Sequence, residues 1–268
     1  MQIPQYRSVF ISDVHLGSRA CQADHVCEFL KTHTCETLYL VGDIIDFWKL
    51  KRGDTYWPQS HSNVIRRILT ASKRGTQVKY VTGNHDDVLR EWFPDLLSVM
   101  GNIQVADHFD HVCVNGDKWF VTHGDLFDGV IRYHRWLSVL GDQAYGVLLW
   151  LNHVVNQARK LMGKDYWSFS NYIKVNTKQA VAFVTRFEEQ VQLYSQSHGY
   201  KGVICGHIHT PQITHSNSFT YVNTGDWCET RSAVVELWDG TMQLWCWDTQ
   251  QGGLTCIKEI GLETAHSE

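Results

Sequence analysis

Residues 12–17 read S-D-V-H-L-G and directly follow the short run V-F-I at residues 9–11. That run predicts a buried β-strand, because it is apolar and partly β-branched. Asp13 and His15 stand two residues apart, so we expect their side chains to point the same way as the strand runs out into a loop. Alone, this pair is consistent with a surface hydrogen bond or with one half of a metal site.

Four further apolar runs in the chain end in the same kind of polar segment. They are followed by G-D-I-I-D at 42–46, G-N-H-D at 83–86, H-G-D at 123–125 and G-H-I-H at 206–209. Any one of these segments has an ordinary interpretation as a turn or as a surface pair of histidines. If all five segments were only turns or surface pairs, they would have to reproduce by chance the ordered residue pattern of a metal site. A shared role for all five is therefore favoured.

The order of apolar runs predicts where these polar segments lie in space. Runs at 38–41 and 78–81 are separated by a helix-like stretch at 63–73, which is typical of βαβ units in an open α/β sheet. Two later hairpins are predicted at Asn115-Gly116 and Asp239-Gly240, each with apolar arms. Since the carboxyl ends of parallel strands line one crevice, we expect the polar segments to converge there.

Seven side chains in these segments are candidate metal ligands, which is too many for one ordinary site. They are Asp13, His15, Asp43, Asn84, His123, His207 and His209. With one bridging carboxylate, seven side chains suit two divalent cations. A mixed set of imidazoles and carboxylates fits manganese, iron or zinc better than calcium or magnesium, and we expect manganese.

The five segments, in this order, resemble the calcineurin-like metallophosphoesterase superfamily, and the resemblance covers residues 8 to about 230. It implies an α/β fold, a four-layer αββα sandwich. It also implies one cation at Asp13, His15, Asp43 and His209, and a second cation at Asp43, Asn84, His123 and His207. Asp43 would bridge the two cations.

The resemblance also implies catalytic roles for residues that are not ligands. His85 would lie over the site, where it stabilises charge on the phosphoryl group or protonates the leaving oxygen. Asp86 would orient His85 or stabilise its charge, and Asp46 and Asp125 would support the site. Other histidines and most aromatic residues are interpreted as structural.

The composition of the 268-residue chain limits the classes of function. A net charge of -4 argues against a nucleic-acid-binding protein. The first residues lack the pattern of a signal peptide, and the eight cysteines contain no C-x-x-C pair, so we expect free thiols in the cytoplasm. The apolar run 136–155 contains Asp142 and Gln143, which disfavour a membrane-spanning helix.

Residues 126–200 differ from the rest of the chain. They contain eight basic and five acidic residues, a net charge of +3, and their pattern predicts helices. We therefore predict a phosphoesterase core at 1–125 and 201–262, a helical cap insertion at 126–200 and a tail at 263–268.

The predicted cap resembles that of UDP-2,3-diacylglucosamine pyrophosphatases, enzymes of lipid A synthesis. The resemblance implies a lipid-linked sugar nucleotide as substrate, cleaved to UMP and an acylated sugar 1-phosphate, and peripheral contact with the cytoplasmic face of the inner membrane. Apolar residues 148–151 would hold acyl chains. The substrate-binding set would be Asn84, Arg159, Lys160, Lys164, Lys174 and Lys178.

One residue departs from the best-known branch of that family, which has G-N-R-D where this chain has G-N-H-D with His85. Arginine clamps phosphate, whereas histidine can also transfer a proton. Two alternatives therefore stay open. One is a soluble phosphoesterase acting on nucleotides, phosphodiesters or phosphoproteins, and the other is an inactive metal-binding scaffold.

Overall fold

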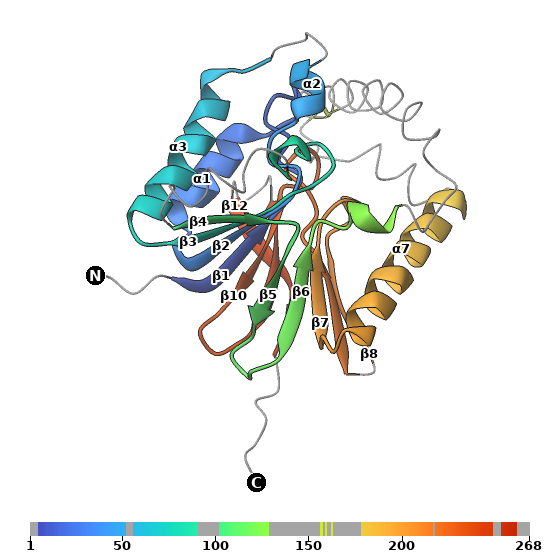
Figure 1. The fold of residues 1–268 in the computed structure, drawn as a ribbon. Coiled ribbons are helices and arrows are strands. Elements are labelled where there is room, and N and C mark those ends of the chain that lie inside the picture. Colours follow the sequence, from blue (N-terminus) through green and yellow to red (C-terminus); the bar gives the residue numbers. More distant parts are fainter. Residues whose placement is uncertain are drawn as a thin grey trace.

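Two β-sheets pack face to face, and helices cover their outer sides (Figure 1). The structure is a computed structural model. It describes residues 5–51, 56–90, 102–128, 156–157, 159, 162, 178–216, 218–248 and 253–261. Within them the architecture is the predicted α/β class with four layers, two sheets flanked by helices.

The first sheet has seven strands in the order β12-β11-β10-β1-β2-β3-β4. Strands β1 to β4 are parallel, and helices alternate with them along the chain, as the sequence predicts. This half contains β1 (Tyr6–Ile11), α1 (Ala23–Thr32), β2 (Cys35–Val41), α2 (Phe47–Lys51), α3 (Gln59–Lys73), β3 (Gln77–Val81) and β4 (Ile103–Ala106). The antiparallel strands β10 (Ser232–Glu236), β11 (Met242–Asp248) and β12 (Gly253–Ile260) complete the sheet.

The second sheet has five strands in the order β5-β6-β7-β9-β8. These are β5 (His108–Val112), β6 (Lys118–Thr122), β7 (Gly202–Cys205), β8 (Gln212–Ser216) and β9 (Phe219–Asn223). Strands β6, β7 and β9 are parallel. The short 3-10 helix η2 (Asp125–Phe127) follows β6, and helix α7 (Lys178–Ser197) precedes β7.

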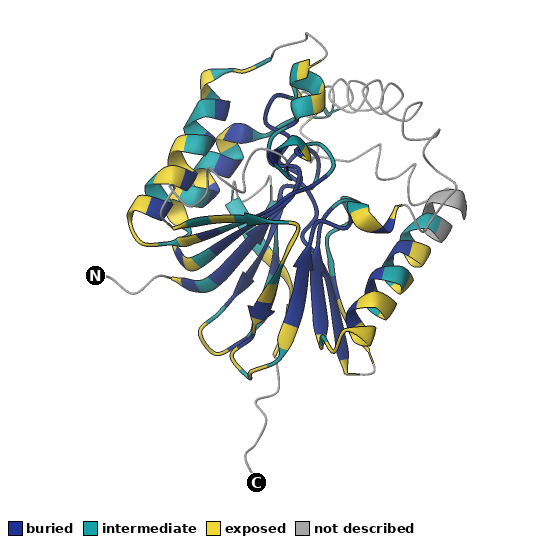
Figure 2. Cartoon of the chain, viewed as in Figure 1, coloured by how far each residue is buried: buried dark blue, intermediate teal, exposed yellow. Residues whose placement is uncertain are grey.

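Alternating side chains along the strands fill three separate apolar layers. On β1, Val9 and Ile11 pack under α1 and α3, whereas Phe10 points into the space between the sheets. On β6, Trp119 and Val121 fill that same space, and the opposite face of the five-stranded sheet is covered by α7. Both faces of each sheet are therefore buried, which is why the central strands are dark in Figure 2 while the outer faces of the helices are exposed.

Both predicted hairpins are present. The turn with Asn115 and Gly116 joins β5 to β6, and the turn with Asp239 and Gly240 joins β10 to β11. Gly116 has φ 87° and Gly240 has φ 88°, backbone conformations that glycine adopts without steric cost. The register of these antiparallel pairs follows from these turns.

Helix α7 lies within residues 126–200, and its Phe187 and Val191 are fully buried against the five-stranded sheet. Most of the predicted cap, including the apolar run 136–155 and residues 148–151, lies outside the described residues. The domain boundaries therefore stay a prediction. No helix among the described residues has the length and hydropathy that crossing a bilayer requires.

Candidate metal centre

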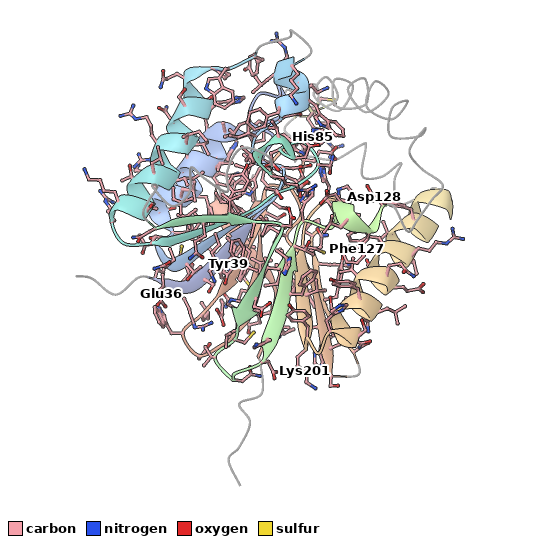
Figure 3. All side chains as sticks on the ribbon, viewed as in Figure 1. Glu36, Tyr39, His85, Phe127, Asp128 and Lys201 are labelled. Carbon is pink, nitrogen blue, oxygen red and sulfur yellow. The ribbon has the colours of Figure 1, made fainter. Side chains whose placement is uncertain are left out.

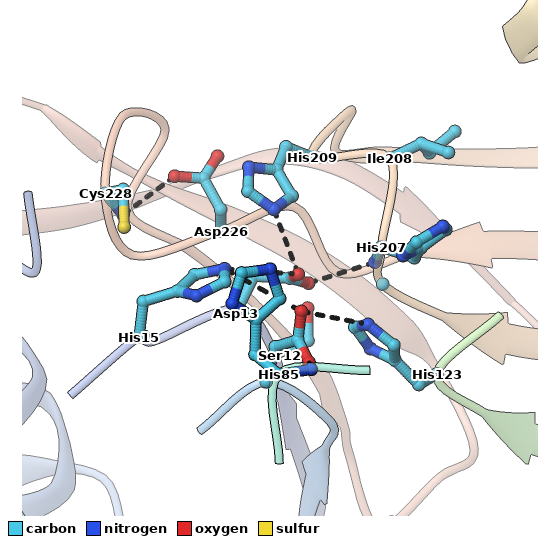
Figure 4. Close-up of polar contacts among 12 residues, drawn as sticks. Ser12, Asp13, His15, His85, His123, His207, Ile208, His209, Asp226 and Cys228 are labelled. Carbon is cyan, nitrogen blue, oxygen red and sulfur yellow. Dashed lines mark hydrogen bonds and ion pairs between the residues drawn. The ribbon is translucent and has the colours of Figure 1, made fainter. Parts of the chain in front are cut away.

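The predicted ligands come from loops at one end of both sheets. Asp13 and His15 follow β1, Asp43 follows β2 and Asn84 follows β3, three neighbouring parallel strands. From the other sheet, His123 follows β6, while His207 and His209 follow β7. The carboxyl ends of these strands meet, as predicted, and Figure 4 shows the histidines arranged around Asp13.

A left-handed backbone is common among these residues. Asp13, His15, Asp43, His207 and His209 have φ between 52° and 67°. Such a conformation costs roughly 1–2 kcal/mol in a residue other than glycine and persists where the surroundings determine it. Asp13 and His15 therefore converge through a strained loop, and not through the alternation of a strand.

Three histidines place their Nε2 atoms close to the carboxylates of Asp13 and Asp43. Asp13 Oδ1 lies 3.0 Å from His209 Nε2 and 3.9 Å from His15 Nε2. Asp43 Oδ2 lies 3.3 Å from His123 Nε2 and 3.9 Å from His15 Nε2. His15 is thus shared between the two carboxylates.

Two glycines allow this close approach of the loops. A Cβ added to Gly83 would collide with the Asp43 carboxylate, and one added to Gly206 would collide with the Asp13 carboxylate. The glycines of G-N-H-D and G-H-I-H are therefore required by space next to the carboxylates.

Buried polar atoms without hydrogen bonds test whether the site suits a cation. His15 Nε2, Asn84 Oδ1 and His123 Nε2 are buried and have no hydrogen-bond partner among the described residues. Leaving such atoms unsatisfied costs free energy, and an ion that they coordinate removes that cost. Three groups have ligand atoms within 4.8 Å of one another: Asp13, His15 and His209; His15, Asp43 and His85; and Asp13, Asp43 and His123. The residues present therefore fit divalent cations.

The electrostatics of the site agree with cation binding. Burial raises the pKa of Asp13, but His209 and His123 outweigh it and lower that pKa to about 2. Burial also opposes ionisation of Asp43, whose pKa His123 nevertheless holds well below its usual range. Burial lowers the pKa of His15, yet Asp46 and Asp43 raise it to about 9. Without metal, protonated imidazoles balance the carboxylates, and cations can replace those protons.

His85 is held by Asp46 and covered by an indole ring. Its Nδ1 lies 3.0 Å from Asp46 Oδ1, so the Nδ1–H can donate to that carboxylate. Its backbone N–H donates to Asp43 Oδ1 at 2.8 Å. The ring centroid of Trp48 lies 4.2 Å from that of His85. From the sequence alone, most aromatic residues are interpreted as packing, and Trp48 is not singled out although it lies two residues after Asp46.

The partner of His85 is Asp46 and not Asp86, which corrects the orienting role that the sequence suggests for Asp86. Asp86 accepts hydrogen bonds from Tyr80 Oη and Gly83 N at 2.6 Å and from Ile44 N at 2.9 Å. It therefore ties the G-N-H-D loop to the loop after β2. Burial, with the nearby Asp43 charge, raises the pKa of Asp86 to about 6.

His207 differs from the other predicted ligands because its Nε2 contacts Asp128. The two carboxylate oxygens of Asp128 lie 2.9 and 3.0 Å from that nitrogen. The His207 ring centroid lies 5.1 Å from that of His123, so the ring is at the site. Asp128 is absent from the sequence predictions, because it belongs to none of the five segments. Asp125, predicted to support the site, pairs with Arg90 at 3.1 Å.

Most of the basic residues predicted to bind substrate lie outside the described residues. Lys160, Lys164 and Lys174 lie outside them. Arg159 is described as helical, and Lys178 begins α7. The role of these basic residues in binding substrate stays a prediction.

Comparisons with known proteins relate the chain to one family of phosphoesterases. The sequence model of the family described as "Calcineurin-like phosphoesterase" matches residues 6–211. A relative named "UDP-2,3-diacylglucosamine hydrolase" from Neisseria meningitidis serogroup B is 26% identical over 243 residues, 85% of this chain and 92% of that protein. One of the same name from Haemophilus ducreyi is 25% identical over 235 residues, 85% and 94% of the two chains.

Solved structures with a similar chain trace have low sequence identity. Vacuolar protein sorting 29 from Cryptosporidium parvum is 11% identical, with a TM-score of 0.48, and the match covers 97% of this chain and 100% of that one. The family match spans most of the chain and includes every one of the five segments. The chain therefore belongs to the calcineurin-like phosphoesterase family and is a metal-dependent hydrolase.

Proposed function

We propose that the chain binds two divalent cations at the convergent loops and uses them to hydrolyse a pyrophosphate. One cation is held by Asp13, His15, Asp43 and His209, and the other by Asp43, Asn84, His123 and His207. The single observation that carries this proposal is the convergence of Asp13, His15, Asp43, His123 and His209, whose ligand atoms form groups within 4.8 Å around the two aspartates. Manganese suits the mixed nitrogen and oxygen donors, and iron or zinc are the alternatives.

The hydrogen bonds of two histidines support these ligand roles. His123 Nδ1 lies 2.9 Å from the Val41 carbonyl, so its N–H donates there and Nε2 keeps a lone pair near Asp43. His207 Nε2 lies 2.9 Å from Asp128 Oδ2, so Nδ1 is the nitrogen that would bind the cation. Fixing one ring nitrogen in this way sets the tautomer and orientation of a metal-binding imidazole.

His85 supplies the acid chemistry of the proposed reaction. Bound cations provide positive charge for the phosphoryl oxygens and lower the pKa of water at the site. His85, held at Nδ1 by Asp46 and covered by Trp48, stabilises the phosphoryl charge or protonates the leaving oxygen. Asp46 keeps the ring in place through its contact with Nδ1.

The proposed substrate is UDP-2,3-diacylglucosamine, cleaved to UMP and an acylated sugar 1-phosphate. Two relatives named "UDP-2,3-diacylglucosamine hydrolase", each similar over 85% of this chain, support this substrate. The net charge of +3 at residues 126–200, with an apolar run at 136–155, also suits a diphosphate that carries acyl chains. Such a substrate partitions to membranes, so we propose a cytoplasmic protein in peripheral contact with the inner membrane.

The test compares UDP-2,3-diacylglucosamine with UDP-glucosamine lacking acyl chains, side by side with manganese present. We expect much faster hydrolysis of the acylated compound, since binding energy from remote groups can raise turnover at the reacting centre. The His85→Ala variant is the control that assigns turnover to this site. Equal rates would remove the lipid substrate and favour a soluble phosphoesterase. Hydrolysis of neither compound by metal-loaded protein would favour an inactive scaffold.

A further inference from the structure

A second cluster of potential metal ligands lies away from the convergent loops. It consists of His111 on β5, Cys113 just after β5 and Glu236 on β10, and we call it the His-Cys-Glu cluster. Their ligand atoms lie within 4.8 Å of one another, and all three residues are buried. The cluster joins the two sheets, because β5 and β10 belong to different ones.

The cluster occupies the opposite end of the strands from the candidate metal centre. Glu236 is paired with Ser8 near the amino end of β1, whereas Asp13 follows the carboxyl end of that strand. At about 3.3 Å per residue, three residues of strand separate Ser8 from the strand end at Ile11 by about 10 Å, and Asp13 lies beyond that end. In Figure 3, His85 lies among the loops at that carboxyl end, and Tyr39, the partner of His111, lies within the sheet layer.

His111 carries an unsatisfied nitrogen that faces this cluster. Its side chain is only 3% exposed, and Nε2 lies 3.2 Å from Glu236 Oε2. Nevertheless Nε2 has no hydrogen-bond partner among the described residues. The other ring nitrogen, Nδ1, lies 3.1 Å from Tyr39 Oη. A bound cation needs the tautomer in which Nδ1–H donates to that oxygen and Nε2 keeps its lone pair. Without a cation, Nε2–H faces Glu236 and lowers the pKa of that carboxyl.

From this geometry we propose that the His-Cys-Glu cluster binds one zinc-like divalent cation. One imidazole, one thiolate and one carboxylate are the three donor types of protein zinc sites, and a water would complete four-coordination. The thiolate gives this cluster a preference for borderline and soft cations that the nitrogen and oxygen donors near Asp13 lack. The site would connect the two sheets directly.

The charged groups around the cluster show how it is arranged when no cation is bound. Arg7 Nη1 lies 2.6 Å from both Glu236 oxygens, and Arg7 Nη2 donates to the Val112 carbonyl at 2.7 Å. Burial and the Glu236 charge raise the pKa of the Cys113 thiol despite the nearby Arg7 charge, so a bound cation would supply the further stabilisation that its thiolate needs. In the bound state, the negative charges of the Glu236 carboxylate and the Cys113 thiolate balance the charge of the divalent cation. Arg7 keeps its contact with Glu236. Without a cation, the cluster is an Arg7–Glu236 ion pair beside a neutral thiol.

Cobalt(II) distinguishes these two arrangements, since a cobalt–thiolate bond gives a charge-transfer band in the near ultraviolet. The ligands proposed at the candidate metal centre are nitrogen and oxygen atoms, so cobalt bound there gives no such band. The experiment adds cobalt to metal-free full-length protein and records the spectrum of the wild type, Cys113→Ser and Cys256→Ser. Cys256 is the matched control because its thiol is exposed and open to adventitious binding.

We expect a saturable band in the wild type and in Cys256→Ser that is absent from Cys113→Ser. Zinc content measured after mild chelation should fall by one equivalent in Cys113→Ser and in His111→Gln. Circular dichroism confirms that each variant is folded. No band in the folded wild type, or a band that survives Cys113→Ser and disappears in Cys256→Ser, would overturn the proposal.

Discussion

At the scale of single residues, the candidate metal centre depends on side chains held in unfavourable backbone conformations. Asp13, Asp43 and His209 all have left-handed φ values, and buried atoms of His15 and His123 have no hydrogen bond among the described residues. Such strain and unsatisfied polarity are typical of functional sites, where the surrounding structure imposes them. His85 is different, because its ring is held by Asp46 and stacks near Trp48.

Replacing His85 by alanine separates ligation from chemistry. The metal content of His85→Ala should equal that of the wild type, because His85 is not among the proposed ligands. Turnover should fall by roughly 10²–10⁴-fold, the usual contribution of a positioned acid. Elemental analysis and kcat on the same preparation measure both quantities. The control is His198→Ala at an exposed position, which should keep wild-type turnover.

Loss of metal in His85→Ala would show that His85 is a ligand. That outcome would also contradict the assignment of His85 as an acid. The measurement is decisive because His85, His15 and Asp43 have potential ligand atoms within 4.8 Å of one another.

The convergence of the five segments was predictable from sequence, whereas the contacts of the residues around them were not. Asp13, Asp43 and His123 converge because each follows a parallel strand, and strand order is visible in the sequence. The contacts of Asp46 with His85 and of Asp128 with His207 depend on the path of loops, which no periodic pattern encodes. The orienting role that the sequence suggested for Asp86 was wrong for that reason.

At the scale of elements, helix α7 connects the outer layer of the fold to the candidate metal centre. Phe187 is fully buried between α7 and the five-stranded sheet. Its ring lies where a Cβ on Gly124 would collide with it, next to His123. The ring centroid of Phe187 also lies 5.9 Å from that of His207. Packing of this helix therefore supports the loops after β6 and β7.

Phe187→Ala should lower the free energy of unfolding by about 3–5 kcal/mol, because it leaves a cavity in a packed layer. Leu193→Ala on the same helix should change it by less than about 0.5 kcal/mol, since Leu193 is 59% exposed. Urea denaturation of both variants measures these values. Equal losses in the two variants would show that α7 does not pack as described.

The helices and strands of the core were predictable because the apolar residues of each have a regular spacing and a turn ends each element. Alternation on β1 puts Val9 and Ile11 under the helices and Phe10 between the sheets. The boundaries of the predicted cap were harder to predict from sequence. The residues of α7 have the same helical pattern whether the helix belongs to a cap or packs against the core sheet. Burial of Phe187 and Val191 against the sheet is a tertiary contact that the pattern alone does not determine.

At the scale of the whole molecule, a buried ionic contact links the two sheets. Arg7 and Glu236 lie on neighbouring strands of the seven-stranded sheet, and Arg7 donates to the Val112 carbonyl of the other sheet. Burial opposes the ionised form of Glu236, but His111 and Arg7 outweigh it and lower its pKa. Glu236 therefore stabilises the folded chain through its ionised form.

This contact predicts a pH-dependent difference between the wild type and Glu236→Gln. A folded-state pKa below the unfolded value of about 4.3 means that the stabilisation is fully present above that value. It is lost as the pH falls through the lower folded-state pKa. In chelator-treated protein, Glu236→Gln should cost roughly 2–3 kcal/mol at neutral pH, since breaking one side of a buried pair is costly. That difference should shrink in acid.

Urea denaturation of the two proteins from pH 7 to about pH 3 measures the difference. A difference that stays constant over this range, or that grows in acid, would contradict the ionised Arg7–Glu236 pair as its source.

The central claim is that Asp43 connects two cations, which makes the five loops a single two-metal centre. Its carboxylate lies near His15 and His123, and its Oδ1 accepts the His85 backbone N–H. Removing this one carboxylate should therefore affect both cations at once, whereas removing a neighbouring surface carboxylate should affect neither. Asp87 is that neighbour, exposed in the loop that contains His85.

The most direct measurement is the manganese content per chain of the wild type, Asp43→Ala and Asp87→Ala after reconstitution and desalting. We predict two manganese ions per chain in the wild type and in Asp87→Ala, and well under one in folded Asp43→Ala, with turnover lost in parallel. Manganese also avoids thiolate, so the His-Cys-Glu cluster does not contribute to this count. Active wild-type protein with less than about one metal per chain, unaffected by chelation, would contradict the two-metal account, as would unchanged manganese in Asp43→Ala.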